Sequence, residues 1–336
     1  MPRSIVVRAA GEHSAPGAPV NTAGIEDFPA SDLGEGPVTV EVNYSSINYK
    51  DALVLTGRPG VVRTTPLIAG IDLVGTVVES SSPRWHRGQQ VLANGAGMSE
   101  TRHGGLGALA RPPAEALVAL PGELTARQAA ALGTAGYTAA LSVLRIAQAG
   151  VESSRDEPIL VTGATGGVGS VAVMLLSALG HHVAALTGRV DEFSDYLIGL
   201  GAAQIVDRQE LGTLGRPLQK QRWAGVVDTV GGTVLANALA QTRYQGTVTA
   251  CGLAASTDLP ATVMPFILRA VTLAGIDSVQ APYAARQAAW ALLAERVDVG
   301  ALEALTRTVA LGEAVEASAQ LLGGQSHGRI VVDVSA

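Results

Sequence analysis

The segment PILVTGATGGVGSVAVMLLSALGHHVAAL, residues 158–186, decides the fold of this chain. Residues 159–162 form a short apolar run that ends in glycines, which predicts a buried strand. From Ser170 onward, apolar residues recur at the i, i+3, i+4, i+7 spacing of a helix that packs on a sheet. Residues 183–186 predict a second strand. Strand, glycine turn, helix and strand form one βαβ unit of the dinucleotide-binding kind.

The glycines of this unit have separate predicted tasks. Read as A-x-G-x-x-G, the pattern puts Ala164 at the first glycine position, in the tight turn. Gly166 lets a pyrophosphate approach the backbone, and Gly169 lets the helix lie close to the strand. The N–H groups and dipole at the start of the helix attract phosphate. A glycine turn without a ligand is the alternative, and the strands on both sides of the turn disfavour it.

The end of the second strand indicates which dinucleotide binds. NAD sites place a carboxylate about 20 residues after the glycines, on the ribose 2′-hydroxyl. This chain instead has Thr187, Gly188 and Arg189 at that point. Because arginine binds phosphate with two parallel hydrogen bonds, these residues favour NADPH. Asp191 and Glu192 fit the first turn of the next helix better. The alternative is that Arg189 is only a solvated surface charge.

Composition limits the classes of protein that remain. A length of 336 residues suggests about two domains. The net charge of −6 argues against a nucleic-acid partner. The single cysteine, Cys251, excludes an intrachain disulfide and a multi-cysteine zinc site, so we expect no metal. The chain contains no uninterrupted apolar run of about 18 residues and no apolar core near its start, so we expect a cytoplasmic protein without membrane contact.

The first third of the chain predicts a barrel-like β domain. Short strands broken by glycines are expected at residues 38–44, 68–78 and 88–92. Between them, residues 44–57 bring Asn48, Tyr49 and Asp51 to the start of an apolar stretch, where they either act in chemistry or cap a helix. Residues 95–106 predict a flexible glycine-rich loop that serves as a lid. Within that loop, His103 is either a proton donor or a solvated side chain.

The second half continues the alternation of strands and helices. Further strands are expected at 203–207, 225–230, 247–251 and 271–276, which completes a doubly wound parallel sheet of six strands. Ligands bind outside the carboxyl ends of such strands. The tail at 309–334 ends in a strand that we expect to rejoin the first domain. The predicted residues around the cofactor are Thr187, Arg208, Leu253 and Ser278.

With these segments assigned, the chain resembles the zinc-independent medium-chain dehydrogenases/reductases, and within them the bacterial acrylyl-CoA reductase group. The stretch TVMPFILRAVTLAGIDSV at 262–279 is the most diagnostic, and the block RPLQKQRWAG at 216–225 is also specific. Further matching stretches are SINYKDAL at 46–53, PLIAGIDLVGTV at 66–77, GTAGYTA at 133–139, VTGATGGVGS at 161–170, TGR at 187–189 and CGLA at 251–254.

The resemblance implies a fold, a cofactor and a set of contacts. The implied fold is a doubly wound Rossmann domain at 123–282, inserted in a discontinuous GroES-like β-barrel catalytic domain at 1–122 and 283–336. The implied cofactor is NADPH. Relatives carry tryptophans where this loop has Ala96 and His103, and a polar residue near Gly324. The implied cofactor residues are Tyr49, Thr165, Gly166, Gly167, Val168, Thr187, Gly188, Arg189, Arg208, Leu253, Ile267 and Ser278.

The implied reaction reduces the carbon–carbon double bond of a short 2-enoyl-CoA, with acrylyl-CoA converted to propionyl-CoA as the best match. Asn48 and Tyr49 are candidate hydrogen-bond donors for the enolate oxygen, and Asp51 is a candidate proton relay if burial raises its pKa. Reduction of a quinone or a simple enone is one alternative, and a catalytically silent NADPH-binding structural protein is another. The apolar strand at 271–276 lies at a sheet edge, which predicts a homodimer.

Overall fold

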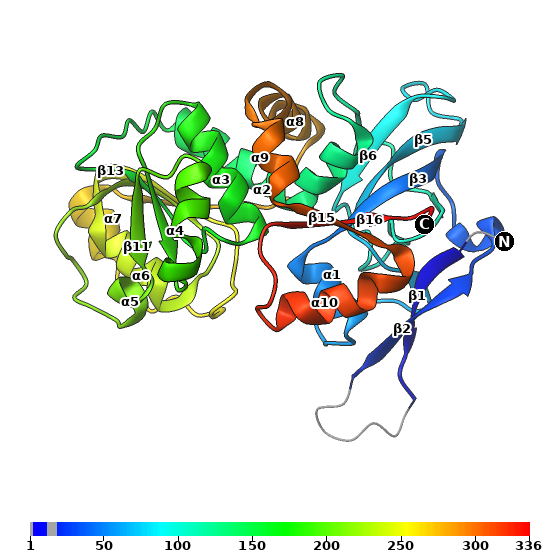
Figure 1. Cartoon of the computed structure of the whole chain (residues 1–336), viewed down its shortest axis with the longest axis horizontal. Coiled ribbons are helices and arrows are strands. Elements are labelled where there is room, and N and C mark those ends of the chain that lie inside the picture. Colours follow the sequence, from blue (N-terminus) through cyan, green and yellow to red (C-terminus); the bar gives the residue numbers. More distant parts are fainter. Residues whose placement is uncertain (1–2, 12–18) are drawn as a thin grey trace. The chain divides into compact units, whose positions relative to one another are not determined.

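The structure is a computed structural model that describes residues 3–11 and 19–336. The chain divides into two compact units (Figure 1). Unit 1 comprises Met1–Thr134, Ser278–Gln287 and Leu302–Ala336, and unit 2 comprises Ala135–Asp277 and Ala288–Ala301. The second unit is thus an insertion in the first. The first segment of unit 1 was predicted to end at residue 122 but continues to Thr134. Residues 288–301 were predicted to lie in the first domain but belong to unit 2.

Unit 2 contains the predicted doubly wound sheet. Its six strands run parallel in the order β11-β10-β9-β12-β13-β14. From β9 to β11 successive strands are added on one side of β9, and from β12 to β14 they are added on the other side. Such sheets bind ligands at this reversal, between β9 and β12. The strands are β9 (Ile159–Val161), β10 (Val183–Thr187), β11 (Gln204–Asp207), β12 (Trp223–Asp228), β13 (Thr242–Ala250) and β14 (Thr272–Gly275).

Helices cover this sheet because their apolar stripes pack on it. Leu235 and Leu239 of α6 pack with Leu160, Val226 and Val248 of the central strands in one buried cluster. Helices α3 and α4 contact strands β9 to β11. The helices that lie wholly within unit 2 are α3 (Gly167–Ala178), α4 (Val190–Gly199), α5 (Gln209–Gly212), α6 (Gly232–Gln241) and α7 (Met264–Arg269).

Unit 1 is built from two sheets. One has the order β2-β1-β4, and the other runs β15-β16-β3-β5-β6-β8 with β7 also paired to β3. Strand β16 pairs antiparallel with β3, so the tail rejoins the first segment as predicted. The strands are β1 (Arg3–Ala9), β2 (Asn21–Asp27), β3 (Val38–Ile47), β4 (Leu67–Ile68), β5 (Asp72–Ser80), β6 (Gln90–Asn94), β7 (Leu109–Ala110), β8 (Leu117–Ala119), β15 (Thr306–Ala310) and β16 (Arg329–Asp333).

The strand predicted at residues 68–78 is two strands in the structure. Gly70 separates β4 from β5 and has a φ of 103°. A Cβ at Gly70 would lie 2.7 Å from the backbone nitrogen of Leu106. The chain therefore bends at Gly70, where only glycine combines this backbone conformation with so close an approach.

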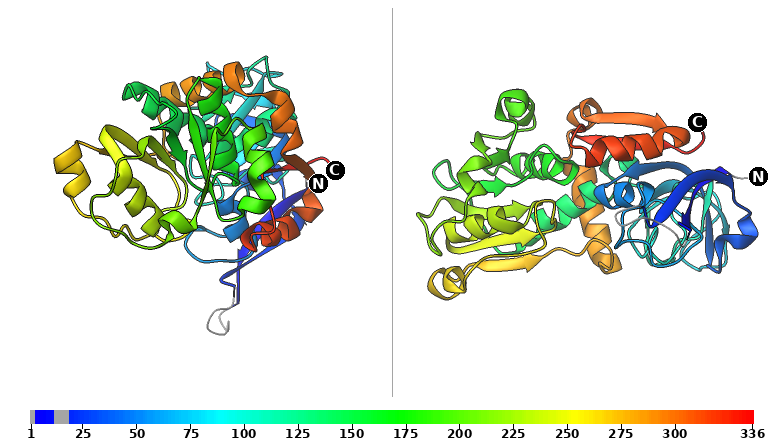
Figure 2. Two further views of the ribbon diagram at one scale, coloured as in Figure 1. Left: turned by 60° about the vertical axis from the view of Figure 1, so that its left-hand side comes forward. Right: turned by 90° about the horizontal axis from the view of Figure 1, so that it is seen from below.

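The remaining helices belong to unit 1 or are divided between the two units. Helix α10 packs against α1 around Leu55, Ala314 and Ala317, and Figure 2 shows it beside β15. Helix α2 is long and apolar enough to span a membrane, but 78% of its apolar window is buried, as in core helices. These elements are η1 (Ala30–Leu33), α1 (Tyr49–Leu55), α2 (Ala126–Gln148), α8 (Tyr283–Arg296), α9 (Val299–Ala304), η2 (Leu311–Glu313) and α10 (Ala314–Leu322).

The glycine-rich loop at 95–106 is packed into unit 1, so the prediction of a flexible lid is wrong. Met98 and Ser99 are buried, and Ser99 Oγ accepts a hydrogen bond from the backbone nitrogen of Gly70 at 3.1 Å. His103 Nδ1 accepts a hydrogen bond from the backbone nitrogen of Ile68 at 3.0 Å. Burial lowers the pKa of His103, although interactions with Asp32 oppose the shift. His103 therefore holds the loop in place as a neutral ring.

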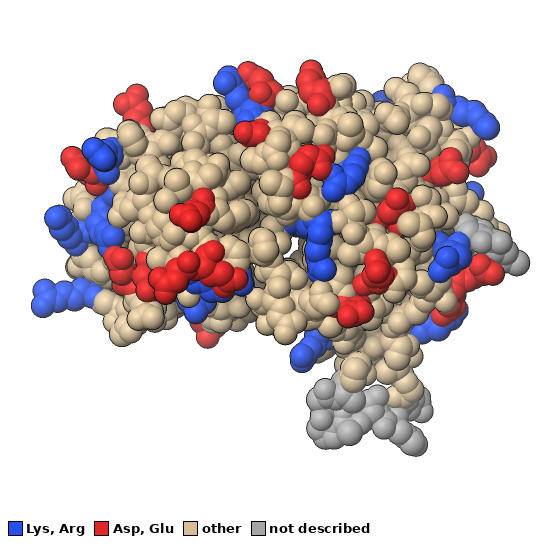
Figure 3. All heavy atoms as spheres, in the orientation of Figure 1, with Lys and Arg blue, Asp and Glu red and all other residues tan. Residues whose placement is uncertain are grey.

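Neither unit has a uniformly basic surface. Acidic and basic side chains both occur over each unit on the face drawn in Figure 3. This mixture agrees with the net charge of −6. Local arginines, rather than a general positive field, therefore have to bind any phosphate.

Helix α2 is kinked at Gly133, which generates a stability prediction. Gly133 has φ 47° and ψ −153°, and its Cβ would lie 2.5 Å from both Asp72 Oδ2 and Ser46 Oγ. Gly150 also has positive φ, at 65°, but its Cβ would meet nothing within 4 Å. We expect Gly150→Ala to cost about 1–2 kcal/mol for its backbone conformation alone, and Gly133→Ala to cost clearly more. Urea denaturation measures both free energies of unfolding, and equal losses would contradict the prediction.

Candidate active site

The predicted nucleotide residues of unit 2 gather at one edge of its sheet. Strands β9, β10 and β11 are parallel neighbours, so their carboxyl ends meet at the same edge. The glycine turn and the start of α3 follow β9, and Arg208 follows β11. The predicted residues at this edge are Thr165, Gly166, Gly167, Val168, Thr187, Gly188, Arg189 and Arg208.

Close contacts explain the glycines of the turn. A Cβ at Gly169 would lie 2.3 Å from the carbonyl oxygen of Gly163, so α3 approaches the turn as only glycine allows. Gly163 itself has a φ of 59°, and its Cβ would lie 2.4 Å from Thr229 Oγ1. The tight turn therefore requires glycine at Gly163, one residue before the predicted Ala164. Gly166 is the N-cap of α3 and is exposed at its start, where phosphate is favoured.

Two arginines flank the end of β10. Arg189 is the N-cap of α4, and its Cζ lies 4.2 Å from the ring centroid of Phe193. A Cβ at Gly188 would lie 2.8 Å from Arg208 Cζ, so the guanidinium group of Arg208 lies directly against this glycine. The hydroxyl of Thr187 accepts a hydrogen bond from the backbone nitrogen of Arg189 at 3.2 Å. This set of donors fits a ribose 2′-phosphate.

The acidic residues near this edge lie where the sequence predicted them. Asp191 and Glu192 are in the first turn of α4, and Glu192 forms a long ion pair of 3.9 Å with Arg189. Neither residue follows β10 directly, in the position of a carboxylate for the ribose 2′-hydroxyl. The geometry at the end of β10 therefore agrees with NADPH.

A buried carboxylate ties the loops together at the reversal point of the sheet. Asp228, at the end of β12, accepts a hydrogen bond from Thr162 Oγ1 at 2.7 Å and one from the backbone nitrogen of Gly231 at 2.8 Å. Burial raises the pKa of Asp228, and these hydrogen bonds oppose the shift. The sulfur of Cys251 lies 3.2 Å from the carbonyl oxygen of Asp228. Asp228 thus joins the loops after β9 and β12 with the start of α6.

A second polar cluster lies in unit 1 around the buried Asp72. Its Oδ2 atom accepts hydrogen bonds from Ser46 Oγ at 2.6 Å and Asn48 Nδ2 at 2.7 Å. The backbone nitrogen and hydroxyl of Thr134 donate to the two carboxylate oxygens at 2.8 and 2.6 Å. Asn94 Nδ2 donates to Oδ1 at 2.6 Å. Both oxygens are thus satisfied by side chains and backbone from four segments of the chain.

Asn48 and Asp51 cap helix α1 within this cluster. Asp51 Oδ2 accepts hydrogen bonds from the backbone and side-chain nitrogens of Asn48 at 2.9 and 3.1 Å. Asp51 Oδ1 accepts one from the backbone nitrogen of Ile71 at 2.8 Å. Burial, with repulsion from the Asp72 carboxylate, raises the pKa of Asp51 to about 7, while the hydrogen bonds oppose this shift. Asn48 and Asp51 therefore belong to the structural hydrogen bonds of the cluster.

Arg329 is the cation of the cluster. It is buried, and its Nε donates to the carbonyl oxygen of Ala131 at 2.6 Å. Its Nη2 donates to Ser46 Oγ at 3.2 Å and to Asn48 Oδ1 at 3.1 Å. Burial lowers the pKa of Arg329, and the Asp72 and Asp51 carboxylates oppose that change. One arginine thus balances part of the charge of two buried carboxylates.

Four predicted site residues remain, and they lie on different segments of the chain. Tyr49 begins α1 and remains 50% exposed, unlike its neighbours Asn48 and Asp51. Leu253 follows β13 and is exposed, whereas Ser278 belongs to unit 1. Ile267 lies on α7, whose last residue donates to the carbonyl oxygens of Ala240 and Thr242 near the amino edge of the sheet. The contact of Ile267 with a cofactor stays a prediction.

Several residues of these clusters are not among the site residues predicted from the sequence. Asp72 and Arg329 lie in apolar strand segments, where a charged residue is itself a signal of a buried pair. Asp228 carries the same signal at the end of the apolar β12. Asn94 and Thr134 give no such signal, because polar residues at segment ends are common. Their role depends on segments that lie far apart in the sequence.

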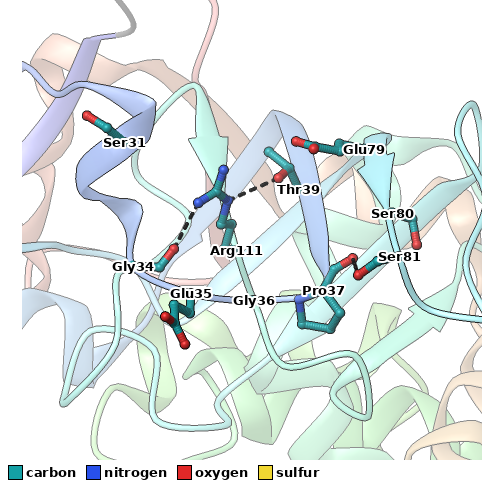
Figure 4. A pocket seen from close by; sticks show the side chains of 10 residues that line it. All are labelled: Ser31, Gly34, Glu35, Gly36, Pro37, Thr39, Glu79, Ser80, Ser81 and Arg111. Carbon is teal, nitrogen blue, oxygen red and sulfur yellow. Dashed lines mark hydrogen bonds between the residues drawn. The ribbon is translucent and has the colours of Figure 1, made fainter.

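A separate hollow in unit 1 carries no comparable cluster. It has a volume of about 540 Å³ and lies beside Arg111, which donates to the carbonyl oxygen of Gly34 at 2.9 Å and to Thr39 Oγ1 at 3.1 Å (Figure 4). Glu35 and Glu79 line it but lie apart from each other. In residues 3–11 and 19–336, no three His, Cys, Asp or Glu side chains gather in a way that holds a metal ion.

The fold and the nucleotide site together define a dinucleotide-binding oxidoreductase. Residues 34–122 match the family described as alcohol dehydrogenase GroES-like domain, and residues 167–295 match that described as zinc-binding dehydrogenase. The chain is 47% identical over 313 residues to an Escherichia coli protein named a probable acrylyl-CoA reductase, AcuI, covering 93% of this chain and 96% of that protein. It is 47% identical to the acrylyl-CoA reductase AcuI of Ruegeria pomeroyi, covering 94% and 95% of the two chains. The chain therefore belongs to the acrylyl-CoA reductase family of the medium-chain dehydrogenases/reductases.

Other relatives and solved structures support the same family assignment. YhfP of Bacillus subtilis, provisionally named a quinone oxidoreductase, is 42% identical and covers 92% of this chain and 93% of its own. The Salmonella enterica yhdH oxidoreductase, solved in complex with NADP, has a TM-score of 0.92 at 44% identity, covering 98% and 99% of the chains. Bacillus subtilis yhfP, solved with NAD bound, has a TM-score of 0.92 at 39% identity, covering 99% of each chain.

The raised pKa of Asp51 generates a prediction for stability against pH. Because the pKa rises from its ordinary value of 3.8 to about 7, the folded protein binds the Asp51 proton more tightly than the unfolded chain. This proton stabilises the fold fully below about pH 4, and the stabilisation is lost as the pH rises towards 7. Between about pH 5 and pH 8 this contribution falls by roughly 2–3 kcal/mol.

Asp51→Asn removes this titration. We expect the variant to be less stable than the wild type at both pH values, because an amide meets backbone donors there, but to lose less stability between them. Urea denaturation at the two pH values measures this difference. An equal change in both proteins would show that Asp51 is ionised throughout the range.

Proposed function

We propose that this protein is an NADPH-dependent reductase of the carbon–carbon double bond of a short 2-enoyl-CoA, with acrylyl-CoA as the best match. The observation that carries the cofactor choice is the pair of arginines, Arg189 and Arg208, at Gly188. The substrate class is supported by 47% identity to acrylyl-CoA reductases over nearly the whole chain. The name of the Bacillus subtilis relative supports a quinone as the second candidate substrate, and a simple enone is grouped with it.

Unit 2 holds the nucleotide in this proposal. The start of α3 at Gly166 and Gly167 binds the pyrophosphate through backbone N–H groups. Arg189, Arg208 and Thr187 bind the 2′-phosphate, and Asp228 keeps the loops at the edge of the sheet in place. When bound, NADPH supplies the hydride for the β-carbon of the unsaturated thioester.

Unit 1 supplies groups for the thioester in this proposal. Negative charge develops on the thioester oxygen during reduction, and a donor placed there stabilises it. Tyr49 is the candidate donor because its side chain is half exposed. Asn48 and Asp51, which were also predicted to be catalytic, are better suited to hold Tyr49 at the start of α1, because their polar atoms are engaged within the cluster.

The nucleotide end of CoA requires cationic partners outside the NADPH site. Arg58, Arg63 and Arg102 are exposed on loops of unit 1 and are the candidates for its phosphates. We further propose that the protein acts in the cytoplasm, without a metal.

The substrate assignment is tested by kcat/KM for acrylyl-CoA, crotonyl-CoA, methyl vinyl ketone and a quinone, with NADPH and with NADH. The protein is first dialysed against a chelator. We expect the thioesters to exceed the simple enone by at least about tenfold, because only they bring phosphates to arginine, and NADPH to be preferred. If the enone or quinone reacts as well as the thioesters, the second candidate replaces the first. Absence of turnover with every substrate would favour the silent NADPH-binding protein.

We also propose that two copies pair through unit 2. Strand β14 is the edge strand of the sheet, as predicted, and an edge strand has backbone groups available for pairing. Helix α7, directly before it, and its N-cap Val263 present exposed apolar side chains, among them Ile267 and Leu268. An apolar surface next to an edge strand suits a second copy of the same chain around a two-fold axis.

Dimer formation is tested by light scattering at micromolar concentration. We expect a dimer for the wild type and a shift toward monomer for Leu268→Asp, because a charge at the interface costs desolvation energy. Ile198→Asp on α4 is the matched control, since Leu268 and Ile198 are both 56% exposed. A monomeric wild type, or equal behaviour of the two variants, would contradict this interface.

A further inference from the structure

The guanidinium group of Arg189 lies over an aromatic ring that no part of the proposed function uses. Its Cζ is 4.2 Å from the ring centroid of Phe193. Arg189 is the N-cap of α4 and Phe193 lies four residues further on, so the two side chains occupy the same face of the first turn. Cations are attracted to the face of such a ring. A guanidinium group can lie over a ring in this way and still direct N–H donors to a phosphate, because its donors lie in its own plane.

The Phe193 ring is itself held in place from the side of the glycine turn. It is buried, and it makes an edge-to-face contact with Tyr196 at a centroid distance of 5.9 Å. The Tyr196 hydroxyl donates to Ser170 Oγ at 2.9 Å, and Ser170 Oγ donates to the carbonyl oxygen of Gly166 at 2.7 Å. A continuous series of contacts therefore joins Arg189 to the N-cap of α3.

A competing position for Arg189 is also present. The Glu192 carboxylate lies 3.9 Å from Arg189 Nη1 and is largely exposed. An exposed ion pair of this length restrains the arginine weakly. Without the ring, the guanidinium has more conformations available, including closer pairing with Glu192, and ordering it on a phosphate costs more side-chain entropy.

We propose that Phe193 is a positioning residue that sets the preference for NADPH over NADH by holding the Arg189 guanidinium ready for the 2′-phosphate. This inference rests on the proposed use of NADPH. Phe193 acts through Arg189 alone and does not touch the ribose hydroxyl that NADH carries. Its removal therefore weakens recognition of the 2′-phosphate and leaves the rest of the nucleotide site unchanged.

The test compares binding of adenosine 2′,5′-bisphosphate with that of 5′-AMP by calorimetry, using the full-length protein. The dissociation constant of 5′-AMP divided by that of the bisphosphate measures recognition of the 2′-phosphate alone. The measurement needs no acyl substrate. We expect Phe193→Leu to lower this ratio about two- to fivefold, with 5′-AMP binding unchanged. Leu197→Ala is the matched control, because Leu197 is buried on the same helix and has no ring. We expect it to lower stability and to leave the ratio unchanged.

A double-mutant cycle with Arg189→Ala separates this role from general packing. If Phe193 acts through Arg189, Phe193→Leu has no further effect on the ratio once Arg189 is alanine. An unchanged ratio in Phe193→Leu, or an equal effect in both backgrounds, would overturn the inference. If the wild type itself does not prefer the bisphosphate, the proposed use of NADPH fails, and the inference fails with it. If Phe193→Leu does not fold, Phe193→Met takes its place in the same cycle.

Discussion

Unit 1 depends on a buried carboxylate, Asp72, that accepts five hydrogen bonds from Ser46, Asn48, Asn94 and Thr134. A buried carboxylate is costly unless its oxygens are satisfied, so each donor has to stay where it is. These donors come from β3, the start of α1, the end of β6 and the kink of α2. The same constraint explains Gly133, where a Cβ would collide with Asp72. One charged group thus sets the path of segments that are far apart in the sequence.

In unit 2, close backbone contacts hold the loops at the carboxyl edge of the sheet. The loops after β9, β12 and β13 meet at the carboxyl edge of the sheet, where the order of the strands reverses. A Cβ at Gly252 would lie 2.0 Å from the carbonyl oxygen of Thr229, and Gly163 packs on the side chain of the same threonine. Asp228 adds hydrogen bonds to Thr162 and Gly231. Because these loops have little room to move, the glycine turn presents its backbone N–H groups in a fixed arrangement, which suits the binding of a pyrophosphate.

The two units contribute different chemistry to the proposed reaction. The carboxyl edge in unit 2 offers helix N–H groups and arginines, which recognise phosphate. The cluster in unit 1 offers a rigid start to α1, with Tyr49 as its exposed member. The prediction of a lid at residues 95–106 is wrong because that loop is packed on Gly70 and Ile68 by Ser99 and His103. These hydrogen bonds connect the loop to the segment from β4 to β5, which carries Asp72.

The sequence by itself determined the doubly wound sheet, because short apolar runs, glycine turns and helical spacing are local patterns. It also determined the residues at the end of β10, since Thr187 is the last residue of the strand and Gly188 and Arg189 follow it directly. Only the tertiary structure decided that Gly163, rather than Ala164, requires glycine, because the reason is contact with Thr229. The same holds for the partners of Asp72 and for the stacking of Arg189 on Phe193. Hydrogen bonds and contacts between distant segments depend on which elements become neighbours, and a local pattern of residues does not contain that information.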